Sequence, residues 1–197
     1  MKKKIGVWLV GARGRLASTV IVGARAIARG LAGREGLVTE LPELAALPLV
    51  GPDQLVFGGW EVVSEGLLKE AWAMALQERA LPADLVGALE EDLRVVEGRI
   101  RPGFLEGGGP ATRALAARAY LPRREPLGAA VNRLGDDLDR FRAEHKLETV
   151  VVVNLASTEP LIEIGPERRR LDAFRQLIRL DRRRRVTPSV LYAYAAL

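Results

Sequence analysis

The amino-acid sequence predicts an α/β fold with a doubly wound, mostly parallel sheet, and three segments carry this prediction. Ile5 to Val10 and Val150 to Asn154 are apolar on nearly every successive residue, which is typical of parallel strands covered on both faces. Pro126 to Lys146 precedes the second of these strands and has apolar residues at helical spacing. This succession of strand, helix and strand indicates right-handed βαβ units, with Ile5 to Val10 at the centre of the sheet.

The size and composition of the chain favour a single domain over residues 1–197. A chain of 197 residues can bury roughly 70% of its unfolded surface, and 48% of its residues are hydrophobic. The absence of cysteine excludes disulfides and thiolate chemistry. The single histidine, His145, leaves no His/Cys metal cluster, and we expect it at the solvated surface.

Glycines and prolines divide the first part of the chain. We expect a helix from Gly14 to Arg29, because Gly30 and Gly33 suit the left-handed conformation that often ends helices. A short strand is expected at Leu37 to Thr39. The three prolines of Leu41 to Pro52 then exclude a continuous element.

The middle of the chain should return to the sheet and then form helices. Leu55 to Phe57 is expected as a strand that stops before the Gly58-Gly59 pair. Ser64 would cap a helix that ends at Arg79, and Pro82 would start another that ends at Leu93. Arg101 to Pro110 contains three successive glycines, which are costly to order, and is expected as a loop.

The last helix is expected to begin at Thr187, with Pro188 in its first position, and to run to Leu197. Its side chains leave no polar face, so the sheet, another subunit or a further domain should cover part of it.

A basic segment lies just before this helix. Pro166 to Arg185 carries nine arginines against three acidic residues, and its apolar residues recur at helical spacing. This pattern predicts an amphipathic helix with a basic outer face. A nucleic-acid surface over Arg168 to Arg185 is an alternative, but no aromatic residue is interleaved on the basic side of the helix to stack on bases, which favours a solvated face.

The glycine turn after the first strand is the strongest sign of function. Gly11, Gly14 and Ala17 have the spacing of a variant dinucleotide fingerprint. Gly11 can take the tight turn, Gly14 lets a pyrophosphate approach the backbone, and Ala17 lets the helix pack closely on the strand. The same spacing also occurs in plain turns between a strand and a helix. The residues that would hold the pyrophosphate are Gly11, Ala12, Arg13, Gly14, Arg15, Leu16 and Ala17.

Five blocks follow one another along nearly the whole chain. They are the glycine turn with Ser18 and Thr19, LVTELPEL at Leu37 to Leu44, DQLVFGGWEV at Asp53 to Val62, VVVNLASTEP at Val151 to Pro160, and TPSVLYAYAAL at Thr187 to Leu197. FGGW and the strand end NLASTEP are the more specific of them, because a generic dinucleotide fold demands neither. In this order the blocks resemble the myo-inositol-1-phosphate synthase family.

The resemblance implies a Rossmann-like NAD-binding domain and an isomerase that uses bound NAD. Such an enzyme oxidises glucose 6-phosphate, closes the ring by an intramolecular aldol step, and reduces the product with the same cofactor. The resemblance places Gly58, Gly59 and Glu61 near the adenosine side of NAD. It places Asn154, Ser157 and Thr158 near the nicotinamide or its ribose.

The chain departs from the family at two points. Glu61 stands where an aspartate is typical, and the family's following catalytic and assembly domain, with its phosphate-binding and enolate-stabilising lysines, is not in this sequence. We therefore expect no catalytic residue here, and either a missing catalytic domain or a homo-oligomer as partner. A non-catalytic dinucleotide-binding or subunit-interaction module is the alternative.

The start of the chain resembles a secretory leader only in part. Its apolar stretch is short, and Arg13 and Arg15 follow without a cleavage-type pattern. The sequence has no run of about 18 apolar residues for a membrane span. We therefore expect a cytoplasmic protein without a membrane contact.

Overall fold

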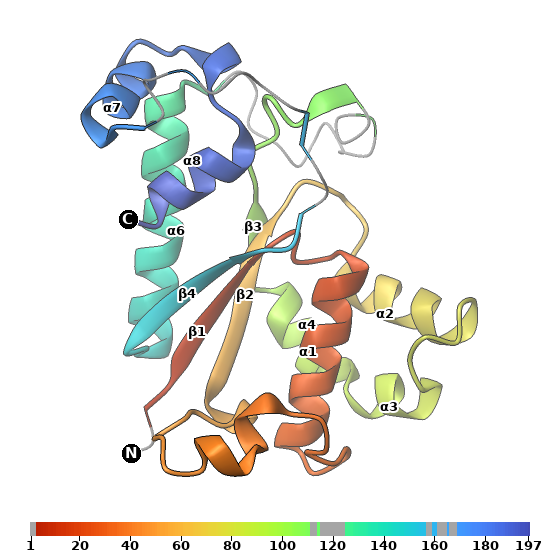
Figure 1. The fold of residues 1–197 in the computed structure, drawn as a ribbon. Coiled ribbons are helices and arrows are strands. Elements are labelled where there is room, and N and C mark those ends of the chain that lie inside the picture. Colours follow the sequence, from red (N-terminus) through yellow and green to blue (C-terminus); the bar gives the residue numbers. More distant parts are fainter. Residues whose placement is uncertain (1–2, 111–113, 115–124, 157–158, 161–164, 166–168) are drawn as a thin grey trace.

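The computed structural model describes residues 3–197 except 111–113, 115–124, 157–158, 161–164 and 166–168. These residues form a central sheet with helices on both faces (Figure 1). The expected doubly wound α/β fold is therefore confirmed.

The sheet is parallel throughout and has the strand order β3-β2-β1-β4. β1 lies between β2 and β4, with Ile5 opposite both Leu55 and Thr149. In this order the chain turns from one side of β1 to the other, which creates a crevice at the carboxyl ends of β1 and β4. The strands are β1 (Ile5–Val10), β2 (Leu55–Glu61), β3 (Ile100–Pro102) and β4 (Thr149–Asn154).

The helices divide between the two faces of the sheet (Figure 1). One face carries α1 (Arg15–Ala28), α2 (Leu67–Leu76), α3 (Ala83–Ala88) and α4 (Glu90–Glu97). The other carries α6 (Leu127–His145), α7 (Leu171–Arg179) and α8 (Pro188–Ala195). Single-turn 3-10 helices occur at Val38–Glu40, Pro42–Leu44, Pro52–Gln54 and Arg183–Arg185. None of the helices in the described ranges is long and apolar enough to cross a membrane.

Several expected boundaries were wrong. The strand expected at Leu37 to Thr39 is a 3-10 turn, because no neighbouring strand pairs with it. Gly66, and not Ser64, caps α2, and the helix expected from Pro82 to Leu93 is divided at Leu89. The expected loop at Arg101 to Pro110 begins inside the short strand β3.

The alternation of side chains along β1 produces two separate apolar cores. Leu9 faces α1, α2 and α4, whereas Trp8 faces α6 and α8. On the second face, the ring centroid of Trp8 lies 5.3 Å from that of Trp60 and 4.8 Å from that of Phe141. Large rings therefore fill the space between the sheet and α6.

The apolar side chains of α8 are largely covered by the protein's own fold. Leu191 and Tyr192 are buried against the second core, and the Tyr192 ring stacks on Trp60 at 5.1 Å. Leu197, by contrast, is 92% exposed. We expected other parts of the structure to cover this helix, and the sheet and α6 cover most of its apolar side chains.

We expected the strand to stop before Gly58 and Gly59, and this was wrong. The whole FGGW segment lies within β2. A Cβ atom on Gly58 would lie 2.8 Å from the Trp8 ring. A Cβ atom on Gly59 would lie 2.2 Å from the Leu9 carbonyl oxygen and 2.6 Å from the Cβ of Ala12. Both glycines are therefore required by the close packing of β2 against β1 and its side chains.

We predict that Gly59→Ala destabilises the protein by at least about 3 kcal/mol, since the added methyl group meets backbone that cannot move aside as a side chain can. Gly135→Ala, in the middle of α6 with no atom within 4 Å of the added group, is the matched control and should stabilise by about 0.5–1 kcal/mol. Urea denaturation measures both. A Gly59→Ala protein as stable as the parent would contradict the packing argument.

Candidate functional site

A cavity of about 300 Å³ lies at the carboxyl ends of β1, β2 and β4, in the crevice that the strand order creates. This volume is at the lower end of the range of about 300–1,000 Å³ for small-molecule sites. The residues that line it are Val10, Gly11, Arg13, Gly14, Arg15, Trp60, Glu61, Val62, Val63, Glu65, Glu70, Phe104, Leu105, Gly108, Leu155, Ala156, Glu159, Pro188 and Tyr192.

The glycine turn forms one wall of the cavity. Gly11 has a φ of +80°, and a Cβ atom there would lie 3.3 Å from the Ala156 backbone that follows β4. The Gly14 N–H donates to the Gly11 carbonyl at 3.0 Å, and Gly14 is the N-cap of α1. The turn thus brings the start of α1 directly to the end of β4.

The N-terminus of α1 presents backbone donors at this wall. The helix ladder begins where the Ser18 N–H donates to the Gly14 carbonyl at 2.9 Å, so the N–H groups of Arg15, Leu16 and Ala17 precede it. Such donors, together with the helix dipole, suit a phosphate. A glycine turn and a helix N-terminus at this place fit the pyrophosphate of a dinucleotide.

Glu61 connects this turn to the end of β2. Its side chain is buried, and its carboxylate accepts the N–H of Arg13 at 2.9 Å, of Val62 at 2.7 Å and of Val63 at 3.1 Å. A carboxylate has about four acceptor positions, so three are used by the backbone and one is left for a ligand hydroxyl. Glu61 fits the position of an acidic residue that contacts a ribose.

The two arginines of the turn have carboxylate partners within the protein. Arg13 is only 9% exposed, and its guanidinium forms an ion pair with Glu97 and donates to the Val63 carbonyl at 2.9 Å. Arg15 is 67% exposed and pairs with Glu70 and Glu78. Their charges are therefore partly neutralised by neighbouring carboxylates. The contacts of Arg13 with Glu97 and Val63 also hold the turn in place.

The other residues expected at the site occupy three different settings. Ala12 and Ala17 are buried beneath the turn, Leu16 is 57% exposed, and Gly58 and Gly59 are enclosed in β2. Asn154 is exposed at the end of β4, one residue before the cavity lining, and donates to Ser189 Oγ at 3.0 Å. Ser157 and Thr158 lie outside the described residues.

Two segments that are distant in the sequence form the far wall. The Ser189 N–H donates to the Glu159 carboxylate at 2.7 Å, so a residue of the segment that follows β4 caps the start of α8. The Tyr192 hydroxyl accepts the Phe104 N–H at 2.6 Å and donates to the Phe104 carbonyl at 3.1 Å. Burial raises the pKa of Tyr192, so the hydroxyl stays protonated and keeps both bonds.

This role of Tyr192 was not predicted from the sequence. We expected α8 only as an apolar helix that other parts of the structure would cover, with no connection to the cavity. The signal available was the pair of specific blocks, NLASTEP and TPSVLYAYAAL, which the structure brings together through Glu159 and Ser189.

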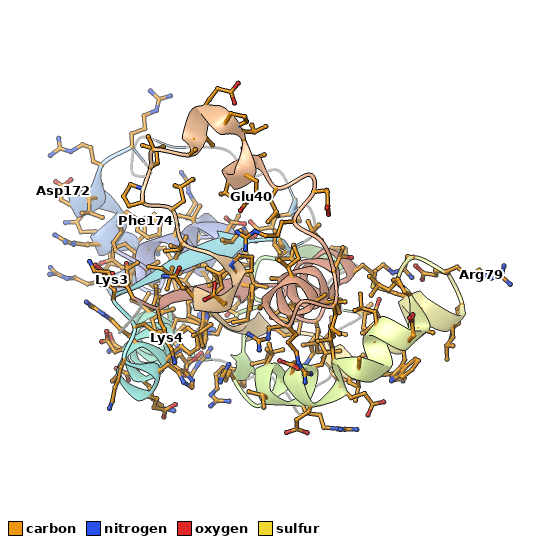
Figure 2. The ribbon with its side chains drawn as sticks, turned by 90° about the horizontal axis from the view of Figure 1, so that it is seen from below. Lys3, Lys4, Glu40, Arg79, Asp172 and Phe174 are labelled. Atoms are coloured by element: carbon orange, nitrogen blue, oxygen red, sulfur yellow. The ribbon has the colours of Figure 1, made fainter. Side chains whose placement is uncertain are left out.

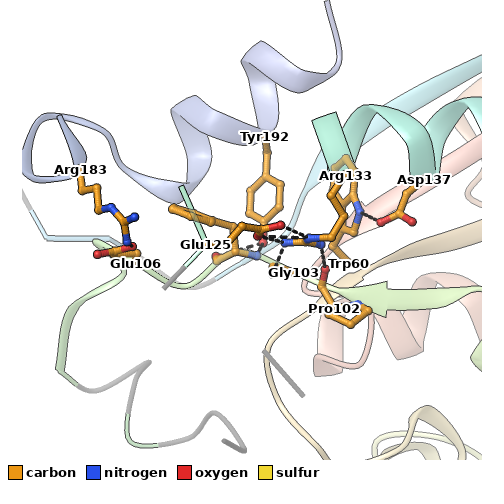
Figure 3. Close-up of polar contacts among 10 residues, drawn as sticks. Trp60, Pro102, Gly103, Glu106, Glu125, Arg133, Asp137, Arg183 and Tyr192 are labelled. Atoms are coloured by element: carbon orange, nitrogen blue, oxygen red, sulfur yellow. Dashed lines mark hydrogen bonds and ion pairs between the residues drawn. The ribbon is translucent and has the colours of Figure 1, made fainter. Parts of the chain in front are cut away.

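Polar contacts connect the cavity residue Trp60 to α6 and fix the nearby end of β3 (Figure 3). The Trp60 Nε1–H donates to Asp137 at 3.0 Å, and burial raises the pKa of that carboxyl group. Arg133 pairs with Glu125 at 2.9 Å and also donates to the Pro102 carbonyl at 2.6 Å, which fixes the end of β3. A sequence signal existed here, because Asp137 lies on the apolar stripe of α6.

The described residues include no group of three histidine, cysteine or acidic side chains that could hold a metal ion. The cavity is lined by backbone N–H donors, apolar side chains, the guanidinium groups of Arg13 and Arg15, and the carboxylates of Glu61, Glu65, Glu70 and Glu159. The backbone donors at the start of α1 are the part of this lining that suits a phosphate.

Comparison with known proteins agrees with this geometry. A family model for NAD-binding domains, described as myo-inositol-1-phosphate synthase, matches residues 5–197. Inositol-3-phosphate synthase 1 of Bacteroides thetaiotaomicron is 29% identical over 98% of this chain and 46% of its own length. The inositol-3-phosphate synthase of Spirodela polyrhiza is 28% identical over 98% of this chain and 42% of its own length.

The solved structure of the inositol-3-phosphate synthase of Caenorhabditis elegans has the same fold, with a TM-score of 0.81 and 20% sequence identity. The match covers 99% of this chain and 42% of that chain. The chain thus spans less than half the length of these relatives. Since the family model covers nearly all of it, the chain belongs to the myo-inositol-1-phosphate synthase family and comprises that family's NAD-binding domain.

Proposed function

We propose that this chain holds NAD for an inositol-3-phosphate synthase reaction, in which glucose 6-phosphate becomes myo-inositol 1-phosphate. One observation carries the proposal: the glycine turn, the N-terminus of α1 and the Glu61 carboxylate meet in a single cavity at the strand-order switch. When bound, NAD would supply the hydride transfer that the oxidation and the later reduction require.

The pyrophosphate would be bound by backbone and not by side-chain charge. The N–H groups at Arg15, Leu16 and Ala17 offer donors, and Gly14 leaves room for a phosphate beside the main chain. Arg13 would contribute by holding the turn in place, because its guanidinium binds the Val63 carbonyl and the Glu97 carboxylate.

The adenosine ribose would be bound at the end of β2. Glu61 has an acceptor position left after its three backbone contacts, and a ribose hydroxyl can use it. Gly58 and Gly59 contribute indirectly, by letting β2 approach β1 closely enough for Glu61 to reach the turn.

The nicotinamide half would lie toward the end of β4. Asn154 is fixed there by Ser189, and Ser157 and Thr158 follow it in the sequence. Their assignment rests on the family resemblance. Tyr192 and Phe104 would give the ring an apolar wall.

The groups that stabilise an enolate would come from other polypeptide. In the described part of the chain no lysine lines the cavity, and Lys69 pairs with Glu65 at the surface. This observation also favours the second candidate, a dinucleotide-binding module without turnover. The sugar phosphate substrate and a homo-oligomer stay predictions that rest on the family, and the cytoplasmic location stays a prediction that rests on the sequence of the first residues.

A nucleic-acid role for the basic segment has less support. Phe174 and Ile178 of α7 are buried in the second core. Of its arginines, Arg170 pairs with Asp172, and Arg183 pairs with Asp181 and Glu106. Part of the positive charge is therefore used within the protein, as expected for a solvated face.

We predict that Gly14→Val weakens NAD binding at least about 100-fold, equal to about 2.8 kcal/mol, because the added methyl groups take the place of the pyrophosphate. Calorimetric titration measures the affinity. Gly23→Val, the same substitution in the same helix with no atom within 4 Å of the added Cβ, is the matched control and should bind NAD as the parent does. Equal affinity of all three proteins would show that the turn is only structural.

We predict that a polypeptide of these 197 residues binds NAD but forms no inositol phosphate from glucose 6-phosphate. Binding the cofactor does not replace the groups that stabilise the enolate and move protons. Product analysis with a preparation whose NAD binding has been measured gives the test. Turnover near about 1 s⁻¹ would overturn the assignment and require a catalytic group among the residues present.

A further inference from the structure

A second cavity, of about 510 Å³, lies at the opposite edge of the sheet from the NAD cavity. Figure 2 shows the molecule from this edge, where the strands begin and Lys4 lies beside the end of α6. The start of β2, the last turn of α1, the outer part of α4 and His145 of α6 surround the cavity. None of these residues lines the NAD cavity.

The cavity exists because β3 is short. β3 pairs only with Gly59 to Glu61, so in the described structure no strand lies beside Leu55 to Phe57 on that side. Leu55, Val56 and Phe57 line the cavity along this unpaired edge of β2, with the side chains of Leu55 and Phe57 on one face of the sheet and that of Val56 on the other. Arg99 lies across this edge, with its Nη1 3.5 Å from the Phe57 carbonyl oxygen. An added peptide strand would have to displace this guanidinium, which disfavours a peptide as occupant.

Four basic side chains line the cavity, Lys4, Arg25, Arg29 and Arg99, against three carboxylates, those of Asp53, Glu91 and Asp92. Arg25 and Arg29 share the single carboxylate of Asp92, at 2.7 and 2.9 Å. Arg99 is half-buried and, among the described residues, neither it nor Lys4 forms an ion pair with a carboxylate. Burial lowers the pKa of Arg99, and the neighbouring Arg25 lowers it further.

The other two carboxylates that line the cavity, those of Glu91 and Asp53, also interact with arginines outside the cavity. Glu91 is exposed and lies 3.8 Å from Arg94 on the outside of α4. Asp53 is exposed in the turn before β2 and raises the pKa of Arg34. A half-buried guanidinium without a close anion is costly, and a bound anion would remove that cost.

We propose that this cavity binds a small phosphorylated molecule, with the phosphoryl group held by Arg99 and Lys4 and the rest of the ligand against Leu55, Val56 and Phe57. The volume suits a small molecule, and arginine is well suited to bind phosphate through two parallel hydrogen bonds. The site is separate from the NAD cavity and does not depend on the function proposed above.

His145 provides a built-in reporter for this cavity, because it is the only histidine in the sequence and lines the cavity. Burial lowers its pKa, Arg99 and Lys4 lower it further, and Glu144 opposes them. The Phe141 ring packs against the imidazole with a centroid distance of 5.1 Å. A phosphate beside Arg99 would favour the charged imidazole, so binding should raise the pKa of His145.

The test is an NMR titration of the His145 imidazole from pH 5 to 8, with inorganic phosphate against chloride at equal ionic strength. Phosphate should raise the pKa of His145 in a saturable way. Glucose 6-phosphate and adenosine 5′-monophosphate then show whether a sugar or a nucleoside is the preferred ligand body, by which of them saturates at the lower concentration. No difference between phosphate and chloride would overturn the proposal.

Arg99→Gln should raise the pKa of His145 in the free protein and weaken phosphate binding at least about tenfold. Arg94→Gln, on the exposed side of the same helix region, is the matched control and should change neither. If Arg99→Gln fails to fold, Lys4→Gln at the exposed edge serves instead, with the same direction of effect. Unchanged phosphate affinity in a folded Arg99→Gln or Lys4→Gln protein would contradict the proposal.

Gly14→Val separates this site from the NAD cavity. The variant should lose NAD binding and keep the full response of His145 to phosphate. Loss of the His145 response in a folded Gly14→Val protein would show that phosphate acts through the NAD cavity, and the second site would be wrong.

Discussion

The buried carboxylate of Glu61 is the contact on which the site depends. It accepts N–H groups from the segments that follow two neighbouring strands, from Arg13 after β1 and from Val62 and Val63 after β2. Without it, these half-buried donors would lose their partners within the protein, at a cost of up to about 1–3 kcal/mol for each. One side chain thus connects the ends of β1 and β2 beside the cavity.

This contact requires that β2 pair with β1 without a side chain at Gly58 or Gly59. A side chain at Gly59 would collide with the Leu9 backbone and Ala12. A side chain at Gly58 would collide with the Trp8 ring. Arg13 then secures the turn from behind through Glu97, which also accepts the N–H of Leu67 at 2.8 Å and so fixes the start of α2. The FGGW segment is therefore a packing element first, and it positions Glu61 as a consequence.

The sequence predicted the elements whose pattern is local and strong. β1, β4 and α6 have uninterrupted apolar runs or clear helical spacing, and the structure confirms their bounds within a residue or two. The glycine turn was also visible, because Gly11 requires a positive φ. Leu37 to Thr39 has strand-forming residues but no strand beside it, and only the tertiary structure decides that.

The site was harder to predict where it depends on distant pairs. Nothing in the local sequence shows that Arg13 meets Glu97 or that Tyr192 meets Phe104, because each pair is separated by more than 80 residues. A buried charge on an apolar stripe, as at Asp137, does give a usable signal, since such a group needs a partner. The second cavity depends on the length of β3, which three residues of sequence do not reveal.

The central claim is that the pyrophosphate of NAD lies against the first N–H groups of α1, and amide NMR of the 21.5 kDa chain tests it most directly. On addition of NAD, the account predicts the largest shifts at the amides of Gly14, Arg15, Leu16 and Ala17, with smaller ones at Val62 and Val63. The amides around Arg25 and Arg99 should stay unchanged. Shifts that spare the start of α1 and gather elsewhere would contradict the account.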